Sequence, residues 1–385
     1  MGKYGYYVID ADGHGGEPPR WRHGISAEWR PQMVEYVARM KAIYGDLPGA
    51  GSSVHTEEDR NYGGYAPGEL DFETPLQREG MAVPGPRITD MDLEGIDVTV
   101  MFPPGSGEEW ALGDPGFAAE LCRLLNDARA SYAAHDPTRL KLVAKLPMIH
   151  PERAAVELER CLTRYPDVFV GMVTAQHILH RNLHHPAHDV VWDVVNRYGV
   201  AVCVHGGGQA PDQVPIVVDR YDTRLEKHAF THPFGAMLAV MNFTVGGILH
   251  KFPDLRVGIM EAGCGWLPFW LERLDEEYEL MPDQAPILDR KPSEYFLSGR
   301  CFVGVESTES ALPHVMDQVG DDILCYSSDY CHWDCDFPHS VKLLVDRDDL
   351  SAERKQRILT ANPARLFGIP VPSQPAFEFG VPVPS

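Results

Sequence analysis

Ionisable side chains stand where apolar segments of this 385-residue chain end. The first such segment ends in "IDADGHGG", where Asp12 and His14 lie two residues apart and glycines follow at once. Alternate residues of a strand face the same side, so these two side chains are predicted to project together. A carboxylate beside an imidazole suits a divalent cation, whereas an ordinary acid-rich turn is the alternative interpretation.

Three later apolar segments end in the same way. "AVCVHGGG" places His205 at the boundary, "LRVGIMEAG" places Glu261 there, and "ILCYSSD" places Asp329 there. A single histidine in an apolar strand is usually a core residue, but burying several unpaired charges would cost several kcal/mol for each. A bound metal ion would compensate that charge. The pattern therefore favours a metal site over a set of unrelated polar core residues.

Short β-branched segments, each followed by a segment of helical periodicity, must position these residues. The expected strands are 6–12, 97–102, 140–146, 168–174, 200–205, 256–261, 301–306 and 323–328. The expected helices are 117–135, 154–165, 189–198, 234–252, 267–280 and 352–367. Strands that alternate with helices imply a parallel sheet.

Eight such units predict an α/β fold closed as a (β/α)8 TIM barrel, whose active site lies at the carboxyl ends of the strands. A doubly wound open sheet is the competing architecture, but no G-x-G-x-x-G follows the first strand. We expect one barrel domain over residues 1–370. Within it, a Gly- and Pro-rich insertion at 19–85 follows the first strand and packs over the barrel mouth, and a proline-rich tail occupies 371–385.

The composition excludes several classes of partner. Apolar residues make up 44% of the chain and charged residues 23%, as in globular proteins. The net charge of -22, with no basic stripe, disfavours nucleic acid and anionic membranes as partners. The start "MGKYGYYVID" lacks a signal-peptide core, so we expect a cytoplasmic protein with a small-molecule substrate. The eight scattered cysteines predict reduced, mostly buried thiols.

The segments "IDADGHGGEP", "AVCVHGGG", "FPDLRVGIMEAGCGWLPFWLERLDE" and "SSDYCHWDCDFP", in this order, resemble the amidohydrolase-related proteins of the amidohydrolase superfamily. That family includes decarboxylases similar to aminocarboxymuconate-semialdehyde decarboxylase and γ-resorcylate decarboxylase. The resemblance implies that Asp12, His14, His205 and Asp329 bind the metal, and that the protein is a homodimer. Two imidazoles and two carboxylates would accept Zn2+, and the share of oxygen ligands leaves Mn2+ as the alternative.

Two departures from the family pattern bear on the site. Glu261 stands where many of the decarboxylases have a histidine, so the role of that position is open. The fourth strand, "VFVGMVTAQH", contains no lysine that could form the bridging carbamate of two-metal members. We therefore expect one metal ion.

Other residues are candidates for contact with the substrate. Arg273, in "WLERLDEEYE", resembles an arginine that meets a substrate carboxylate, but a surface salt bridge is an equal alternative. His177 follows the fourth strand, His228 and His232 follow the fifth, and His332 follows the eighth. Each could line the barrel mouth, but the segment that follows His177 is at least equally a polar loop.

The leading functional hypothesis is nonoxidative decarboxylation of an aromatic or conjugated carboxylic acid, with Asp329, Glu261 and His205 as catalytic residues. Asp329, when protonated, would deliver a proton to the carbon that loses CO2. The alternative is hydrolysis of an amide, ester or lactone, in which a metal-activated water attacks and Asp329 takes its proton. A remote alternative is a barrel that binds a small molecule without turnover.

Overall fold

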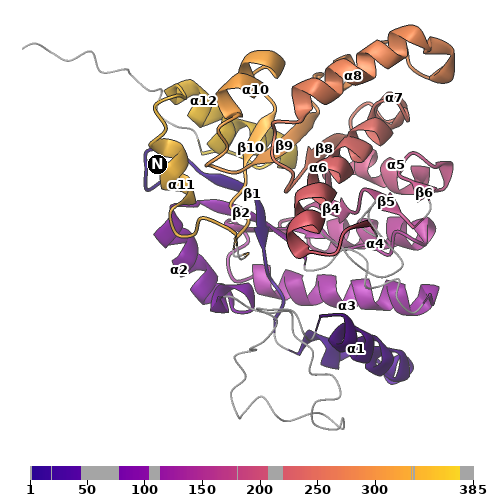
Figure 1. Ribbon diagram of the computed structural model, residues 1–385. Coiled ribbons are helices and arrows are strands. Elements are labelled where there is room, and N and C mark those ends of the chain that lie inside the picture. Colours follow the sequence, from indigo (N-terminus) through magenta and orange to yellow (C-terminus); the bar gives the residue numbers. More distant parts are fainter. Residues whose placement is uncertain are drawn as a thin grey trace, which may run out of the picture.

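Eight parallel strands form one sheet in the computed structural model, and their order in the sheet follows the chain (Figure 1). The structure describes residues 2–18, 20–44, 78–103, 113–179, 181–206, 220–330, 332 and 334–372. The strands are β1 (Ile9–His14), β2 (Val98–Phe102), β3 (Leu140–Ala144), β4 (Phe169–Thr174), β7 (Ala201–Val204), β8 (Arg256–Ile259), β9 (Cys301–Val305) and β10 (Leu324–Tyr326). A separate antiparallel hairpin, β5 (His177–Ile178) and β6 (Arg181–Asn182), follows β4.

The last strand returns to the first. Gly13 forms a parallel bridge with Tyr330, and the His14 N–H donates to the Tyr330 carbonyl oxygen over 2.6 Å. The prediction of a (β/α)8 TIM barrel is therefore confirmed, and a doubly wound open sheet is wrong.

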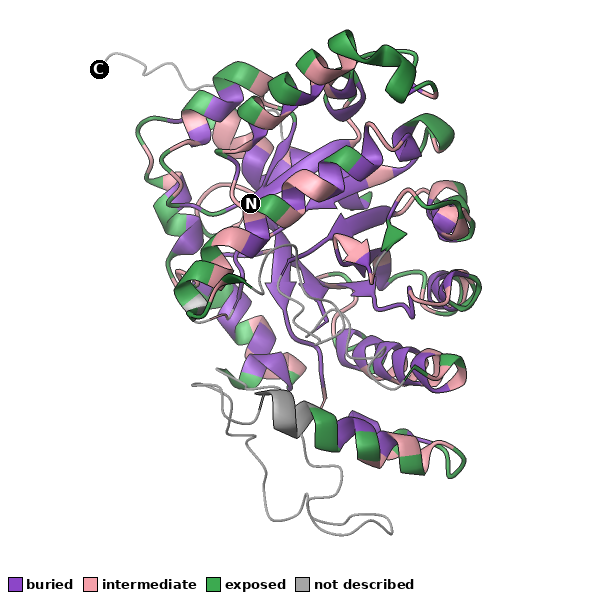
Figure 2. Ribbon diagram, turned by 45° about the vertical axis from the view of Figure 1, so that its right-hand side comes forward, coloured by how far each residue is buried: buried purple, intermediate pink, exposed green. Residues whose placement is uncertain are grey.

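Helices surround the strands, with their outer faces toward solvent (Figure 2). They are α1 (Arg30–Tyr44), α2 (Pro84–Glu94), α3 (Pro115–Ala133), α4 (Pro151–Arg164), α5 (Asp189–Tyr198), α6 (Arg224–Phe243), α7 (Ile248–Lys251), α8 (Leu267–Leu280), α9 (Pro292–Phe296), α10 (Leu312–Val319), α11 (Ser340–Val345), α12 (Ala352–Gln356) and α13 (Asn362–Phe367). None of the described helices is both long and apolar enough to cross a bilayer.

Local sequence signals explain where the helices begin. Asp114 accepts hydrogen bonds from the N–H groups of Gly116 and Phe117, so α3 begins two residues before the predicted start. Thr223 and Glu226 form a capping box that starts α6 ten residues earlier than its apolar periodicity indicated. The predicted helix 234–252 is thus a longer α6, followed by the separate short helix α7.

Two clusters of buried apolar residues stabilise the barrel. Its interior is filled by inward-facing strand residues such as Val100 and Phe302, together with Leu366 and Phe367 of α13. A larger cluster lies between the strands and the surrounding helices. Of the seven described cysteines only Cys335 is not buried, as the composition predicted.

The described part of the predicted insertion packs mainly beside the barrel. Apolar residues of α1, including Met33 and Val37, contact Phe117 and Leu121 of α3. Residues 45–77, which the mouth-covering prediction mostly concerns, lie outside the described residues, as does the tail from 373 onward.

Candidate active site

Three predicted ligands, Asp12, His14 and Asp329, lie together at the closing seam of the barrel, where β1 meets the segment that follows β10. The Asp329 N–H donates to the Asp12 carbonyl oxygen over 2.9 Å, which fixes the two residues side by side. His14 Nε2 lies 3.0 Å from Asp329 Oδ1 and 3.7 Å from Asp12 Oδ1. All three side chains are buried at the carboxyl ends of β1 and β10.

His205 completes this group from the end of β7. Its Nε2 lies 3.6 Å from Asp12 Oδ2, and its ring meets that of His14 edge-on with centroids 5.1 Å apart. Its Nδ1 donates to the Gly206 carbonyl oxygen over 2.7 Å. This hydrogen bond leaves Nε2 with a lone pair directed at the cluster, the usual arrangement of a metal-binding histidine.

The donor set fits a divalent cation. Both Asp12 carboxylate oxygens, Nε2 of His14 and of His205, and Asp329 Oδ1 are buried without a hydrogen-bond partner. Buried polar atoms of this kind are rarely left unsatisfied, and a cation with nitrogen and oxygen ligands would satisfy all five. Burial and the neighbouring carboxylates raise the pKa of Asp12 well above its usual range, whereas burial and His332 lower the pKa of His14 to about 4. A neutral imidazole is the form that binds metal.

Glu261 lies against this group at the end of β8. Its carboxylate is 3.3 Å from His205 Nε2, 3.5 Å from His232 Nε2 and 3.5 Å from His332 Nδ1. Glu261 and Asp329 both adopt left-handed backbone conformations, with φ of 50° and 49°. Such conformations are costly for residues other than glycine and cluster at functional sites.

Three of the predicted substrate-contacting histidines, His228, His232 and His332, lie in or beside the cluster. His332 Nδ1 lies 2.8 Å from Asp329 Oδ1, and its ring stacks on that of His14. Burial would lower the pKa of His332, but Asp329 and Glu261 raise it well above its usual value. The His228 ring packs against that of His232 at an interplanar angle of 44°, with ring centroids 4.3 Å apart.

The structure does not bring Arg273 or His177 to the cluster. Arg273 is half-exposed on α8 and pairs with Glu276 at 3.4 Å and with Glu277. This is the surface ion pair that was the alternative interpretation. His177 lies in the β5–β6 hairpin, where its Nδ1 is 2.8 Å from the Leu179 carbonyl oxygen.

A buried arginine that sequence reasoning missed supports the site from α2. Arg87 donates to the His14 carbonyl oxygen over 2.9 Å and to Thr99 Oγ1 over 3.0 Å. Thr99 in turn donates to Asp10 over 2.8 Å, and the guanidinium lies 3.9 Å from the centre of the Tyr330 ring. Arg87 thus connects both strands of the closing seam to β2.

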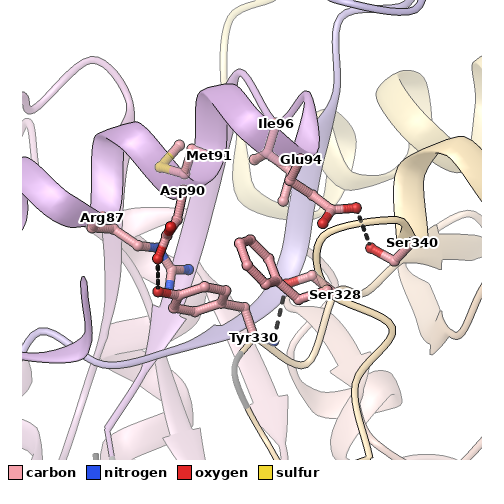
Figure 3. Close-up of a pocket in the computed structure, with 9 residues that line it drawn as sticks. Arg87, Asp90, Met91, Glu94, Ile96, Ser328, Tyr330 and Ser340 are labelled. Carbon is pink, nitrogen blue, oxygen red and sulfur yellow. Dashed lines mark hydrogen bonds between the residues drawn. The ribbon is translucent and has the colours of Figure 1, made fainter. Parts of the chain in front are cut away.

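Figure 3 shows the small pocket behind this seam, with Arg87, Asp90 and Tyr330 meeting on one side. The Tyr330 hydroxyl donates to Asp90. Asp10 accepts hydrogen bonds of 2.8 Å from both the N–H and the hydroxyl of Ser328, next to Asp329. Asp10 is therefore a structural acid that anchors the Asp329 loop.

Replacing Arg87 by methionine is expected to lower the free energy of unfolding by about 3 kcal/mol, because it leaves Asp10 buried without its cation. Denaturant unfolding followed by circular dichroism measures this. Arg273→Met is the matched control, since its exposed ion pairs should contribute within about 0.5 kcal/mol. Equal losses in the two variants would show that Arg87 has no special structural role.

Comparisons with known proteins identify the family. The amidohydrolase family model matches residues 76–369. The chain is 27% identical over 295 residues to the γ-resorcylate decarboxylase of Polaromonas sp. (strain JS666), covering 73% of this chain and 86% of that protein.

Two solved structures share the fold. The 5-carboxyvanillate decarboxylase of Novosphingobium aromaticivorans, complexed with manganese, superposes with a TM-score of 0.70 at 21% identity, covering 95% of this chain and 97% of that one. The dihydroxybenzoic acid decarboxylase of Polaromonas sp. JS666, also with bound manganese, gives a TM-score of 0.67 at 19% identity, covering 94% and 97%. With the family model matching most of its length, the chain belongs to the amidohydrolase family of metal-dependent enzymes.

Proposed function

We propose that this protein is a nonoxidative decarboxylase of an aromatic or conjugated carboxylic acid. The observation that carries the proposal is the placement of Asp329, a candidate proton donor, against His332 and beside a cluster of unpartnered metal-binding atoms. The relatives named above support it, because each is a decarboxylase of an aromatic acid. A small pocket borders Asp329.

Asp12, His14, His205 and Asp329 would hold a divalent cation, which when bound supplies positive charge to the substrate carboxylate and an adjacent oxygen. Zn2+ and Mn2+ both suit this donor set. The manganese in the two similar structures favours Mn2+ over our first expectation of Zn2+.

The chain's own residues would move the proton. Burial would raise the pKa of Asp329, but the adjacent His14 and His332 lower it below its usual value. His332, whose pKa is raised, passes a proton to Asp329 over the 2.8 Å contact. The carbon–carboxylate bond then breaks, its electron pair stays on the substrate carbon, that carbon takes the proton from Asp329, and CO2 leaves.

Hydrolysis of an amide, ester or lactone is the second candidate, and Glu261 favours it by placing another carboxylate beside His205. Purified protein loaded with Mn2+ is incubated with a panel of hydroxyaryl acids and a panel of lactones and amides. We expect CO2 from at least one acid. Hydrolysis of an ester-like substrate without CO2 from any acid would replace the first proposal by the second.

The homodimer implied by the family resemblance stays a prediction. Light scattering of the purified chain measures its mass in solution, and a mass twice the 42.9 kDa of one chain is expected.

A further inference from the structure

The site gathers more carboxylates and imidazoles than the four proposed ligands of the first cation. Four carboxylates lie in or beside the cluster: Asp12, Glu261, Asp329 and Asp334. In the described part of the chain their ion-pair partners are histidines, with no lysine or arginine among them. Because charge in a largely buried site is costly unless it is compensated, carboxylates and imidazoles gathered in this way are candidate cation ligands.

A second set of donor atoms stands beside the first. His228 and His232 are four residues apart on α6, so their side chains share one face of the helix. One nitrogen of each ring and one carboxylate oxygen of Glu261 lie within 4.8 Å of one another. Asp334 lies at the edge of this group, with its Oδ2 3.8 Å from His228 Nε2.

Neighbouring backbone orients His232 for this role. Its Nδ1 donates to the His228 carbonyl oxygen over 2.9 Å, which leaves Nε2 with a lone pair toward Glu261. The same kind of hydrogen bond orients His205 in the first set of donors. Gly206 makes the approach possible, because a Cβ at this position would lie 2.5 Å from Cδ2 of His232.

We propose that His228, His232, Glu261 and Asp334 bind a second divalent cation next to the first. Glu261 lies between the two sets, with Oε2 3.3 Å from His205 Nε2 and 3.5 Å from His232 Nε2. Two imidazoles and two carboxylates suit Zn2+ or Mn2+. The absence of a lysine from β4 led us to expect one metal ion. It does not bear on the second site, because the donors of that site come from α6 and from the segments that follow β8 and β10.

The stoichiometry of metal binding tests this proposal. Full-length protein stripped of metal is dialysed against Mn2+ or, separately, Zn2+, and the bound ion is counted by elemental analysis. We expect two ions per wild-type chain for at least one metal, and one ion per chain in His228→Ala and in Asp334→Asn. For Mn2+, the spin coupling of a close pair in electron paramagnetic resonance should disappear in both variants.

His250→Ala is the control, because this imidazole lies on α7 and contacts the Tyr295 hydroxyl at 2.8 Å. It should keep two ions. Asp334→Asn is nearly isosteric, so it tests the site even if His228→Ala folds poorly. A wild-type chain that takes up no more than one ion of either metal overturns the proposal. So does a second ion that both site variants retain, since that ion would be adventitious.

Discussion

Asp329→Asn is expected to lower kcat for decarboxylation by about a thousandfold or more, because an amide cannot pass a proton to the substrate carbon. The same substitution removes a charged ligand, so metal affinity should fall as well. Measuring CO2 release at saturating metal separates the two effects, because added metal restores occupancy but not the lost proton donor.

Asp346→Asn is the matched control. Asp346 is exposed and pairs with Lys342 on α11, away from the cluster. Its kcat should match that of the wild type. An Asp329→Asn enzyme that retained more than about a tenth of wild-type turnover at saturating metal would exclude Asp329 as the proton donor.

His205→Ala is expected to remove both metal binding at the first site and decarboxylation. In the wild type, metal should stabilise the fold by about 4 kcal/mol when its free concentration exceeds the dissociation constant about a thousandfold. Thermal melts with and without Mn2+ should therefore differ by several degrees in the wild type, and by much less in His205→Ala.

The non-catalytic alternative makes the opposite prediction about activity. A barrel that only binds a small molecule would change in stability when His205 is replaced, with no turnover to lose. Wild-type protein that releases CO2 only with metal, together with an inactive but folded His205→Ala variant, would exclude that alternative.

The positions of the four predicted ligands could be inferred from the sequence because each follows an apolar strand segment. In a parallel barrel every such strand end reaches the same mouth, so His205 and Asp329 join the same cluster although they lie 124 positions apart in the chain. Helix ends were less predictable where a cap lay outside the apolar pattern, as at Thr223.

The alternation of side chains along the first strand did not by itself identify the metal ligands. In a regular strand Asp10 would face the same side as Asp12 and His14. Its carboxylate instead accepts hydrogen bonds from Ser328 and Thr99, so it is not one of the unpartnered ligand atoms. The register between β1 and β2 shifts between Asp10 and Gly13, and such a bulge changes which side chains share a face.

The roles of residues on the helices were hard to predict from the sequence. Arg87 lies in a helix that ends before β2, and only the three-dimensional structure shows that it reaches the His14 carbonyl oxygen. The family resemblance favoured Arg273 as a contact to a substrate carboxylate. On α8, however, Arg273 pairs with Glu276 and Glu277, which follow it by three and four residues. Helical periodicity alone does not show whether an arginine reaches the site, as Arg87 does, or pairs with exposed acids, as Arg273 does.

The most direct test of the account is CO2 release from a hydroxyaryl acid by metal-free protein, before and after Mn2+ is restored. We predict no CO2 above the uncatalysed rate without metal, and sustained release once Mn2+ is bound in wild-type protein but not in Asp329→Asn. CO2 release that persisted after complete metal removal, or that was equal in the two proteins, would contradict it.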